Sequence, residues 1–152
     1  MYPIRLLTIG RPKLPALRDL EKHYQTLLKG HARLDLVELA EGKGDSQRQL
    51  KDEAERLRVH LVGVRCPVLL SADGPPRTSE AFAQWLGLRM DRGDSLAFAI
   101  GSSHGFDPAL KAEVRDHLSL SPMTFPHDLS RVLFLEQLYR AFSILKRTPY
   151  HK

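Results

Sequence analysis

The sequence has little of what would identify a secreted, membrane or disulfide-stabilised protein. Among its 152 residues Cys66 is the only cysteine, which excludes an internal disulfide and a thiolate metal cluster within one chain. No apolar run approaches the roughly 20 residues that a membrane-spanning helix needs. The opening residues, 1–5, lack the basic and then apolar pattern of a secretory signal. We therefore expect a cytoplasmic protein that does not bind a membrane, in a compartment that keeps thiols reduced.

Acidic residues are fewer than basic ones. The chain has 23 Lys and Arg against 18 Asp and Glu, a net charge of +5 with its seven histidines neutral. Such an excess favours a polyanionic partner such as RNA. Many small basic proteins bind no nucleic acid, so charge alone leaves both readings open. The remaining composition, 42% apolar and 27% charged, is ordinary for a globular protein, and we expect one domain over residues 1–152.

Short apolar runs alternate with helical patterns along the whole chain. The runs predict five strands, at residues 4–9, 34–39, 68–70, 96–100 and 118–120. The helices between them are predicted to begin near Pro15, at Ser46, at Thr78 or Ser79, after Asp107 (ending at about Asp116) and near Leu129. Strands 68–70 and 96–100 are wholly apolar, so both of their faces should be buried. This alternation predicts an α/β fold, a parallel sheet with flanking helices.

The first three of these helices each have apolar residues that are predicted to face inward, which in the third are Phe82, Trp85, Leu86 and Met90. In the first, the predicted inward residues are Leu17, Leu20, Tyr24, Leu27 and Leu28. The second begins with the capping-box pair Ser46 and Gln49. Its predicted inward residues are Leu50, Ala54, Leu57 and Leu61. Its charged residues are expected to face water: Lys51, Asp52, Glu53, Glu55, Arg56 and Arg58.

Three loops are candidate ligand sites because they follow the predicted strands that end at Leu70, Ile100 and Leu120. In open α/β sheets, ligands bind beyond the carboxyl ends of the strands. The loop that begins Gly101-Ser-Ser-His-Gly105 has small residues, which let a ligand approach the backbone. It matches neither the dinucleotide-binding glycine motif nor a Walker loop. The serines form no nucleophile elbow and the histidines no metal-binding motif, so we expect no metal.

The final third of the chain, residues 118–151, is the most distinctive. A loop with Pro122 and Pro126 leads into a helix that is apolar on several faces and must be buried on several sides, within its own domain or against a second copy. Glu136 and Arg140 have the spacing of a helical ion pair. The tail ends in Tyr150-His151, where an aromatic ring could stack on a base and the imidazole could move a proton. A disordered tail is the alternative.

These segments carry a resemblance to a known family. The residues concerned are Ile100-Gly101 with Gly105, the stretch Leu118-Ser-Leu-Ser-x-Met-Thr-Phe-Pro-His127, Arg131-Val132, Glu136-Gln-Leu-Tyr139-Arg-Ala141 and Pro149-Tyr150-His151. Together they resemble the RlmH (YbeA-type) methyltransferases of the SPOUT, or α/β-knot, class. The resemblance covers essentially the whole chain, and the C-terminal block is its specific part.

The resemblance implies a C-terminal trefoil knot, a rare exception to unknotted topology, and a homodimer. It implies methylation at N3 of a pseudouridine in helix 69 of the 23S ribosomal RNA, with S-adenosyl-L-methionine as cofactor. The implied cofactor-binding residues are Leu70, Gly101, Leu120, Ser121, Pro122, Met123, Thr124 and Phe125. This chain departs from the family pattern at Ser71, where the family usually has Asp, and at Ser102, where it usually has a second glycine.

Four residues are expected near the reacting atoms: His127, Arg140, Tyr150 and His151. Arg140 would bind phosphate or polarise a base carbonyl, and Tyr150 and His151 would position the base and assist proton loss. The sequence leaves open which group accepts the proton. Two other functions also stay open: a non-catalytic protein that binds or assembles ribosomes on the same fold, and a knotted methyltransferase that acts on tRNA.

Overall fold

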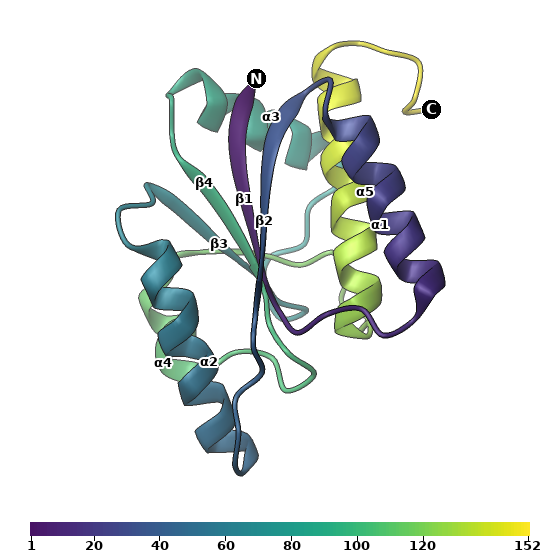
Figure 1. Cartoon of the computed structure of the whole chain (residues 1–152). Coiled ribbons are helices and arrows are strands. Elements are labelled where there is room, and N and C mark those ends of the chain that lie inside the picture. Colours follow the sequence, from purple (N-terminus) through teal and green to yellow (C-terminus); the bar gives the residue numbers. More distant parts are fainter.

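The chain forms a five-stranded parallel sheet with helices on both faces (Figure 1). The computed structural model describes all residues from Met1 to Lys152. Along the sheet the strands lie in the order β2-β1-β4-β3-β5, and each neighbouring pair is parallel. The strands are β1 (Tyr2–Ile9), β2 (Ala32–Leu39), β3 (Cys66–Leu70), β4 (Leu96–Ile100) and β5 (Asp116–Leu118). The helices are α1 (Pro15–Leu28), α2 (Ser46–Leu61), α3 (Ser79–Asp91), α4 (Pro108–Glu113) and α5 (His127–Leu145).

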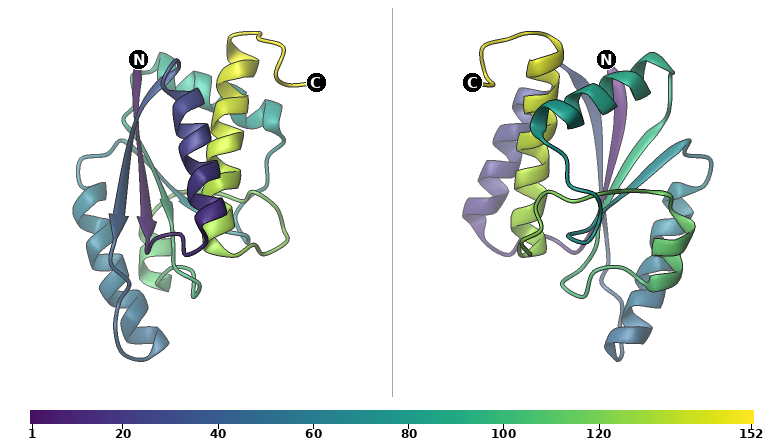
Figure 2. Two further views of the ribbon diagram at one scale, coloured as in Figure 1. Left: turned by 45° about the vertical axis from the view of Figure 1, so that its right-hand side comes forward. Right: turned by 180° about the vertical axis from the view of Figure 1, so that it is seen from behind.

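Successive side chains of the strands enter two separate cores, one on each side of the sheet. On one side α1, α3 and α5 cover Leu6 and Phe98, and on the other α2 and α4 cover Leu7 and Ala99 (Figure 2). All five residues of β4 are buried, because this strand lies between neighbours and under helices on both faces. The predicted α/β fold class, a parallel sheet with flanking helices, is confirmed.

Several predicted boundaries are wrong. Strands β1, β2 and β3 each begin two residues earlier than predicted. The last strand was expected at 118–120, but β5 pairs with β3 only from Asp116 to Leu118. The Ser119 N–H then bonds to the Pro75 carbonyl instead of continuing the ladder. Helix α4 ends at Glu113 and not near Asp116, because Val114 already has extended backbone angles.

Three predictions about single residues of α1 and α2 are also wrong. The N-cap of α2 is Asp45, whose carboxylate accepts the Arg48 N–H, and not Ser46. Leu20 was expected inside but is 44% exposed, and its neighbour Glu21 is buried instead. Glu53 was expected to face water but is buried. Two of the three errors therefore concern carboxylates, Glu21 and Glu53, that have hydrogen-bond partners inside the protein.

Helix α5 lies between α1, α3 and the sheet, as its apolar circumference requires (Figure 2). Phe134, Leu135 and Leu138 are fully buried. Near its start the buried Arg131 donates to Glu21 Oε1 at 2.9 Å, Glu38 Oε2 at 3.0 Å and the Gly10 carbonyl at 3.2 Å. This arginine fixes the first turns of α5 to α1, β2 and the end of β1. None of the helices has the length and apolar character needed to cross a membrane.

The segment after β5 runs alongside the loop after β3. The Ser71 N–H bonds to the Leu118 carbonyl at 3.0 Å, and the Ser119 hydroxyl donates to the Ala72 carbonyl at 3.2 Å. These bonds bring together the two segments on which the predicted knot depends. The knot itself stays a prediction.

Candidate functional site

The carboxyl ends of β3, β4 and β5 open onto one cleft of about 730 Å³. Its walls come from the segments 70–73, 100–106 and 120–130, together with Lys111 of α4. These are the three strand-end loops that the sequence nominated. They converge because β3 lies between β4 and β5 in the sheet, so the ends of all three strands meet at one edge.

Seven of the eight predicted cofactor-binding residues line this cleft, and Pro122 does not. The seven are Leu70, Gly101, Leu120, Ser121, Met123, Thr124 and Phe125. Pro122 lies between Ser121 and Met123 with its ring exposed. Gly101 is required by the turn itself, because a Cβ there would come within 2.4 Å of the Gly105 carbonyl oxygen. Gly105 has φ +80°, which glycine adopts without strain.

An ion pair between Asp73 and Lys111 also lines the cleft, and the sequence analysis missed it. The Lys111 ammonium lies 2.6 Å from Asp73 Oδ2, and the Ser71 hydroxyl donates to the other oxygen of that carboxylate. Hydrogen bonds from Lys111 first, and then from Ser71, lower the pKa of Asp73 to about 2. An acidic group thus stands at this wall although Ser71 occupies the position where the family usually has Asp. Asp73 could have been predicted as a site residue, because it is an acid in a strand-end loop. No feature of the sequence indicated that Lys111 would line the cleft.

The cleft suits S-adenosyl-L-methionine in size and in chemistry. Sites for ligands of this size are usually about 300–1,000 Å³, largely apolar, with a few polar groups. Leu70, Ile100 and Phe125 offer apolar surface for an adenine ring. Asp73 and Lys111 offer one charge of each sign, which matches the ammonium and the carboxylate of a methionine group. The residues present therefore fit this cofactor.

Of the four predicted catalytic residues, only His127 lines the cleft. It is the first residue of α5, and its Nε2 lies 3.0 Å from Asp128 Oδ1. The backbone N–H of Lys13 bonds to the other oxygen of Asp128 at 3.3 Å. The Lys13–Asp128 bond therefore joins the loop after β1 to the start of α5, next to this imidazole.

Arg140, Tyr150 and His151 gather at the other end of α5, around two glutamates. Arg140 bonds to Glu136 Oε1 through Nε at 3.0 Å and Nη2 at 2.5 Å, which confirms the predicted helical ion pair. The Tyr150 hydroxyl donates to the same oxygen at 3.0 Å, and the Arg140 guanidinium lies 4.8 Å from the Tyr150 ring centre. Burial, and then the bond to Glu136, raise the pKa of Tyr150 to about 12. The hydrogen bonds to Glu136 also raise the pKa of Arg140.

The contacts of His151 define its tautomer. Arg140 Nη1 lies 3.1 Å from His151 Nδ1, and a guanidinium can only donate, so Nδ1 must accept. The proton of the neutral ring therefore stands on Nε2, 2.7 Å from Glu80 Oε1 at the start of α3. The Glu80 pKa is lowered by a hydrogen bond from its own backbone N–H and then by His151. Sequence reasoning missed Glu80, because 71 residues separate it from His151.

Within one chain the cleft and this C-terminal cluster lie far apart. Arg140 follows His127 by 13 residues on one continuous helix, about 20 Å at 1.5 Å per residue. A second hollow of about 330 Å³ adjoins the cleft across Leu120 and Phe125 and reaches Ser79 and Gln137. Ser79 donates to Gln137 Oε1 at 2.7 Å, which joins α3 to α5 at that point.

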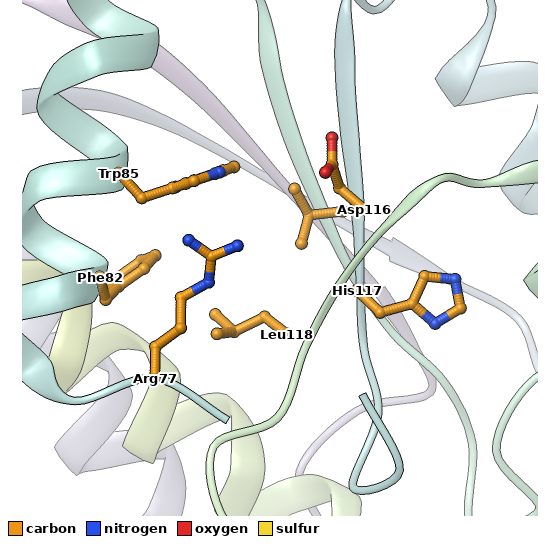
Figure 3. A pocket seen from close by; sticks show the side chains of 7 residues that line it. Arg77, Phe82, Trp85, Asp116, His117 and Leu118 are labelled. Carbon is orange, nitrogen blue, oxygen red and sulfur yellow. The ribbon is translucent and has the colours of Figure 1, made fainter. Parts of the chain in front are cut away.

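A third recess, between α3 and β5, is too small to bind a cofactor (Figure 3). Its volume is about 10 Å³, roughly the room for one water molecule. Figure 3 shows Arg77 beside Phe82 and Trp85, with Asp116 on the opposite strand. The guanidinium carbons of Arg77 and Arg89 lie 5.3 and 5.4 Å from the Trp85 ring centre. This arrangement packs α3 on the sheet edge.

Comparison with known proteins agrees with this architecture. Residues 2–151 match the family model described as a predicted SPOUT methyltransferase. Several relatives are named ribosomal RNA large subunit methyltransferase H. The relative from Gluconacetobacter diazotrophicus is 40% identical over 98% of this chain and 97% of its own length. The relative from Gemmatimonas aurantiaca is 36% identical over 98% of this chain and 99% of its own length. The relative from Gloeobacter violaceus is 38% identical over 97% of each chain.

One solved structure gives an independent view of the fold. It is a methylase family protein from Neisseria gonorrhoeae, with a TM-score of 0.58 over 90% of this chain and 81% of that one. At 11% identity it supports the fold alone. The family model and the curated relatives, by contrast, span almost the full length of this chain, including the cleft and the C-terminal cluster. The chain therefore belongs to the SPOUT methyltransferases, in the family of the ribosomal RNA large subunit methyltransferase H proteins.

Proposed function

We propose that this protein methylates N3 of a pseudouridine in helix 69 of 23S ribosomal RNA, with S-adenosyl-L-methionine as the methyl donor. The observation that carries the proposal is the convergence of the segments after β3, β4 and β5 on one cleft whose lining fits this donor. The names of the relatives support ribosomal RNA as the substrate class. The excess of basic residues suits a polyanion.

The bound donor supplies an electrophilic methyl group on a sulfonium sulfur. The work left to the protein is to orient the target nitrogen in line with that methyl and to help it lose its proton. The small residues of turn 101–105 would let the backbone approach the donor, and Asp73 and Lys111 would hold its charged end. Phe125 and Leu120, which line the cleft, would contact its apolar part and exclude water.

The C-terminal cluster has the groups needed at the target base. Arg140 can leave Glu136 for a phosphate or a base carbonyl, because an arginine binds either through paired N–H groups. Its departure frees the lone pair of His151 Nδ1, while Glu80 keeps the proton on Nε2. His151 Nδ1 can then accept the proton from N3. Tyr150 stays protonated at neutral pH and can donate a hydrogen bond to the base.

We further propose that the protein acts as a homodimer in which the C-terminal cluster of one subunit serves the cleft of the other. A methyl transfer needs its reacting atoms about 3–3.5 Å apart. The roughly 20 Å that separate His127 from Arg140 on a rigid helix prevent both from acting on one base within one chain. A second copy removes this conflict. The exposed leucines of α1 and its approach, Leu14 at 61% and Leu20 at 44%, offer apolar surface for it.

The experiment is methylation of defined RNA with labelled donor. Purified protein is incubated with large subunits, whole ribosomes or tRNA from cells that lack the enzyme. We expect label in 23S RNA and a reverse-transcription stop in helix 69, because an N3 methyl blocks the pairing edge of the base. Label in tRNA would instead favour a tRNA methyltransferase. Calorimetry that finds no binding of the donor would favour a non-catalytic ribosome-binding protein.

A further inference from the structure

Glu53 of α2 is a buried carboxylate whose partners are all neutral. It is 3% exposed. Its Oε1 accepts the Ser102 hydroxyl at 2.7 Å, and its Oε2 accepts the Gly42 backbone N–H at 2.9 Å and the Gln49 side-chain amide at 3.2 Å. Burial of a carboxylate is unfavourable unless such bonds satisfy it. The site therefore depends on each of the three donors.

The Ser102 bond connects this carboxylate to the turn at the cleft wall. Ser102 lines the cleft, yet its hydroxyl bonds away from it, toward α2. The Ser102 carbonyl accepts the Gly105 N–H at 2.9 Å, and Gly101 is packed tightly against the Gly105 carbonyl. The position of Ser102 therefore determines the shape of the whole turn 101–105.

The Gly42 bond connects the same carboxylate to the loop after β2. Gly42 lies so close to α2 that a Cβ would come within 2.3 Å of the Gln49 carbonyl oxygen. Glu53 thus joins the loops after β2 and β4 to α2. The strands β2 and β4 are not neighbours, since β1 lies between them.

We propose that Glu53 is a positioning residue for the methyl-donor site, which acts through Ser102 to hold turn 101–105 in the shape that accepts the donor. This inference rests on the function proposed above. It also gives Ser102 a role at the position where the family usually has glycine. The serine hydroxyl supplies a fixed point that a glycine would lack, and it leaves the backbone of the turn free to face the donor.

Five variants of the full-length protein test the tether by calorimetry with S-adenosyl-L-methionine. Ser102→Ala and Glu53→Ala each remove one end of the bond, and their combination completes a double-mutant cycle. Glu53→Gln keeps a hydrogen bond to Ser102, because the glutamine oxygen can accept the Gly42 N–H while the glutamine NH₂ group donates to the Ser102 oxygen. Glu55→Gln is the matched control, since it removes the same charge from the exposed side of α2.

We expect Ser102→Ala to raise the Kd for the donor about tenfold, as the loss of one bond to a buried carboxylate predicts. Glu53→Ala should do the same, and the double variant should bind no more weakly than either single one. Glu53→Gln should remain within about threefold of wild type, as should Glu55→Gln. At saturating donor kcat should be close to wild type in Ser102→Ala, with the change confined to KM. A merely structural role would not produce this coupling or the rescue by glutamine.

Hydrogen exchange at the Gly105 amide tests the tether without any donor. We expect faster exchange in Ser102→Ala than in wild type, because the Ser102 carbonyl that accepts this amide is no longer fixed. Unchanged donor affinity in Ser102→Ala would overturn the proposal, and so would unchanged Gly105 exchange. Failure of the wild type to bind the donor would instead refute the proposed function, with the exchange rates still deciding whether Glu53 holds the turn.

Discussion

Mixed dimers offer the sharpest test of a site shared between two subunits. One subunit carries Gly101→Val, which distorts the cleft because a side chain at this position meets the Gly105 carbonyl. The other carries His151→Ala, which removes a partly exposed imidazole that belongs to neither core. Each homodimer should lose most activity, about 10²–10⁴-fold if His151 accepts the proton.

The size of the recovery follows from the geometry. If the cluster of one chain serves the cleft of the other, each mixed dimer has one site with both defects and one site with neither. Random reassembly of equal amounts gives about half mixed dimers. The mixture should therefore regain about one quarter of wild-type activity. If instead each site were built within one chain, every site would carry one defect and activity would stay at its floor.

The assay is transfer of labelled methyl to large ribosomal subunits, after the two variants have been unfolded and refolded together. Different affinity tags on the two chains allow the mixed dimers to be isolated and counted. The Gly101→Val protein must elute as a dimer with a native circular dichroism spectrum. Isolated mixed dimers that show no recovery would refute the shared site, as would a wild-type protein that sediments as a monomer at micromolar concentration.

Three further predictions concern the core and the C-terminal cluster. Arg131→Met leaves Glu21 buried without its cation, which should lower the free energy of unfolding by about 3–5 kcal/mol and Tm by roughly 10 °C. The double change Arg131→Met with Glu21→Met should recover most of this stability. Urea unfolding at fixed protein concentration measures the stability of both variants, and a loss below about 1 kcal/mol for the single change would contradict the buried network. Tyr150 has a raised pKa, so the stability from its bond to Glu136 should be complete below the ordinary value of about 10 and lost as the pH rises through about 12. The tyrosinate absorbance that separates wild type from Tyr150→Phe should therefore appear near 12, and a step near 10 would be inconsistent with the burial of this hydroxyl. Glu80→Ala removes the acceptor for the His151 Nε2 proton and should lower turnover about tenfold. Glu80→Gln still has a side-chain oxygen that can accept this hydrogen bond and should retain most of the turnover. Equal turnover in the two variants would show that Glu80 does not orient His151.

The fold could be predicted because its signals are local. The wholly apolar run 96–100 predicted a strand buried on both faces, and the glycine and proline positions separated the elements. The boundaries that failed are set by partners distant in sequence. β5 ends at Leu118 because Ser119 bonds to Pro75, and no pattern within residues 118–120 indicates that partner.

Part of the candidate site was predictable, because its loops follow strands that could themselves be predicted. Strand ends converge in any parallel sheet, so the loops after Leu70 and Ile100 could be nominated without coordinates. Buried carboxylates could not. Glu21 and Glu53 occupy positions that helical periodicity assigns to the surface or leaves unassigned, and only their partners Arg131 and Ser102 explain their burial. The roles of Arg140 and His151 stay predictions, drawn from the residues of α5 and the tail and from the resemblance. The contact of His151 with Glu80 could not be predicted, because 71 residues separate them.

The placement of α5 has a consequence for biosynthesis. Phe134, Leu135 and Leu138, which fill one side of the sheet, are translated after all five strands. Until the final turns of this helix leave the exit tunnel, the apolar face formed by β1, β3 and β4 has no complete cover. Stable folding must therefore wait until α5 has been translated, and a chain truncated within α5 should yield a product that chaperones and proteases recognise.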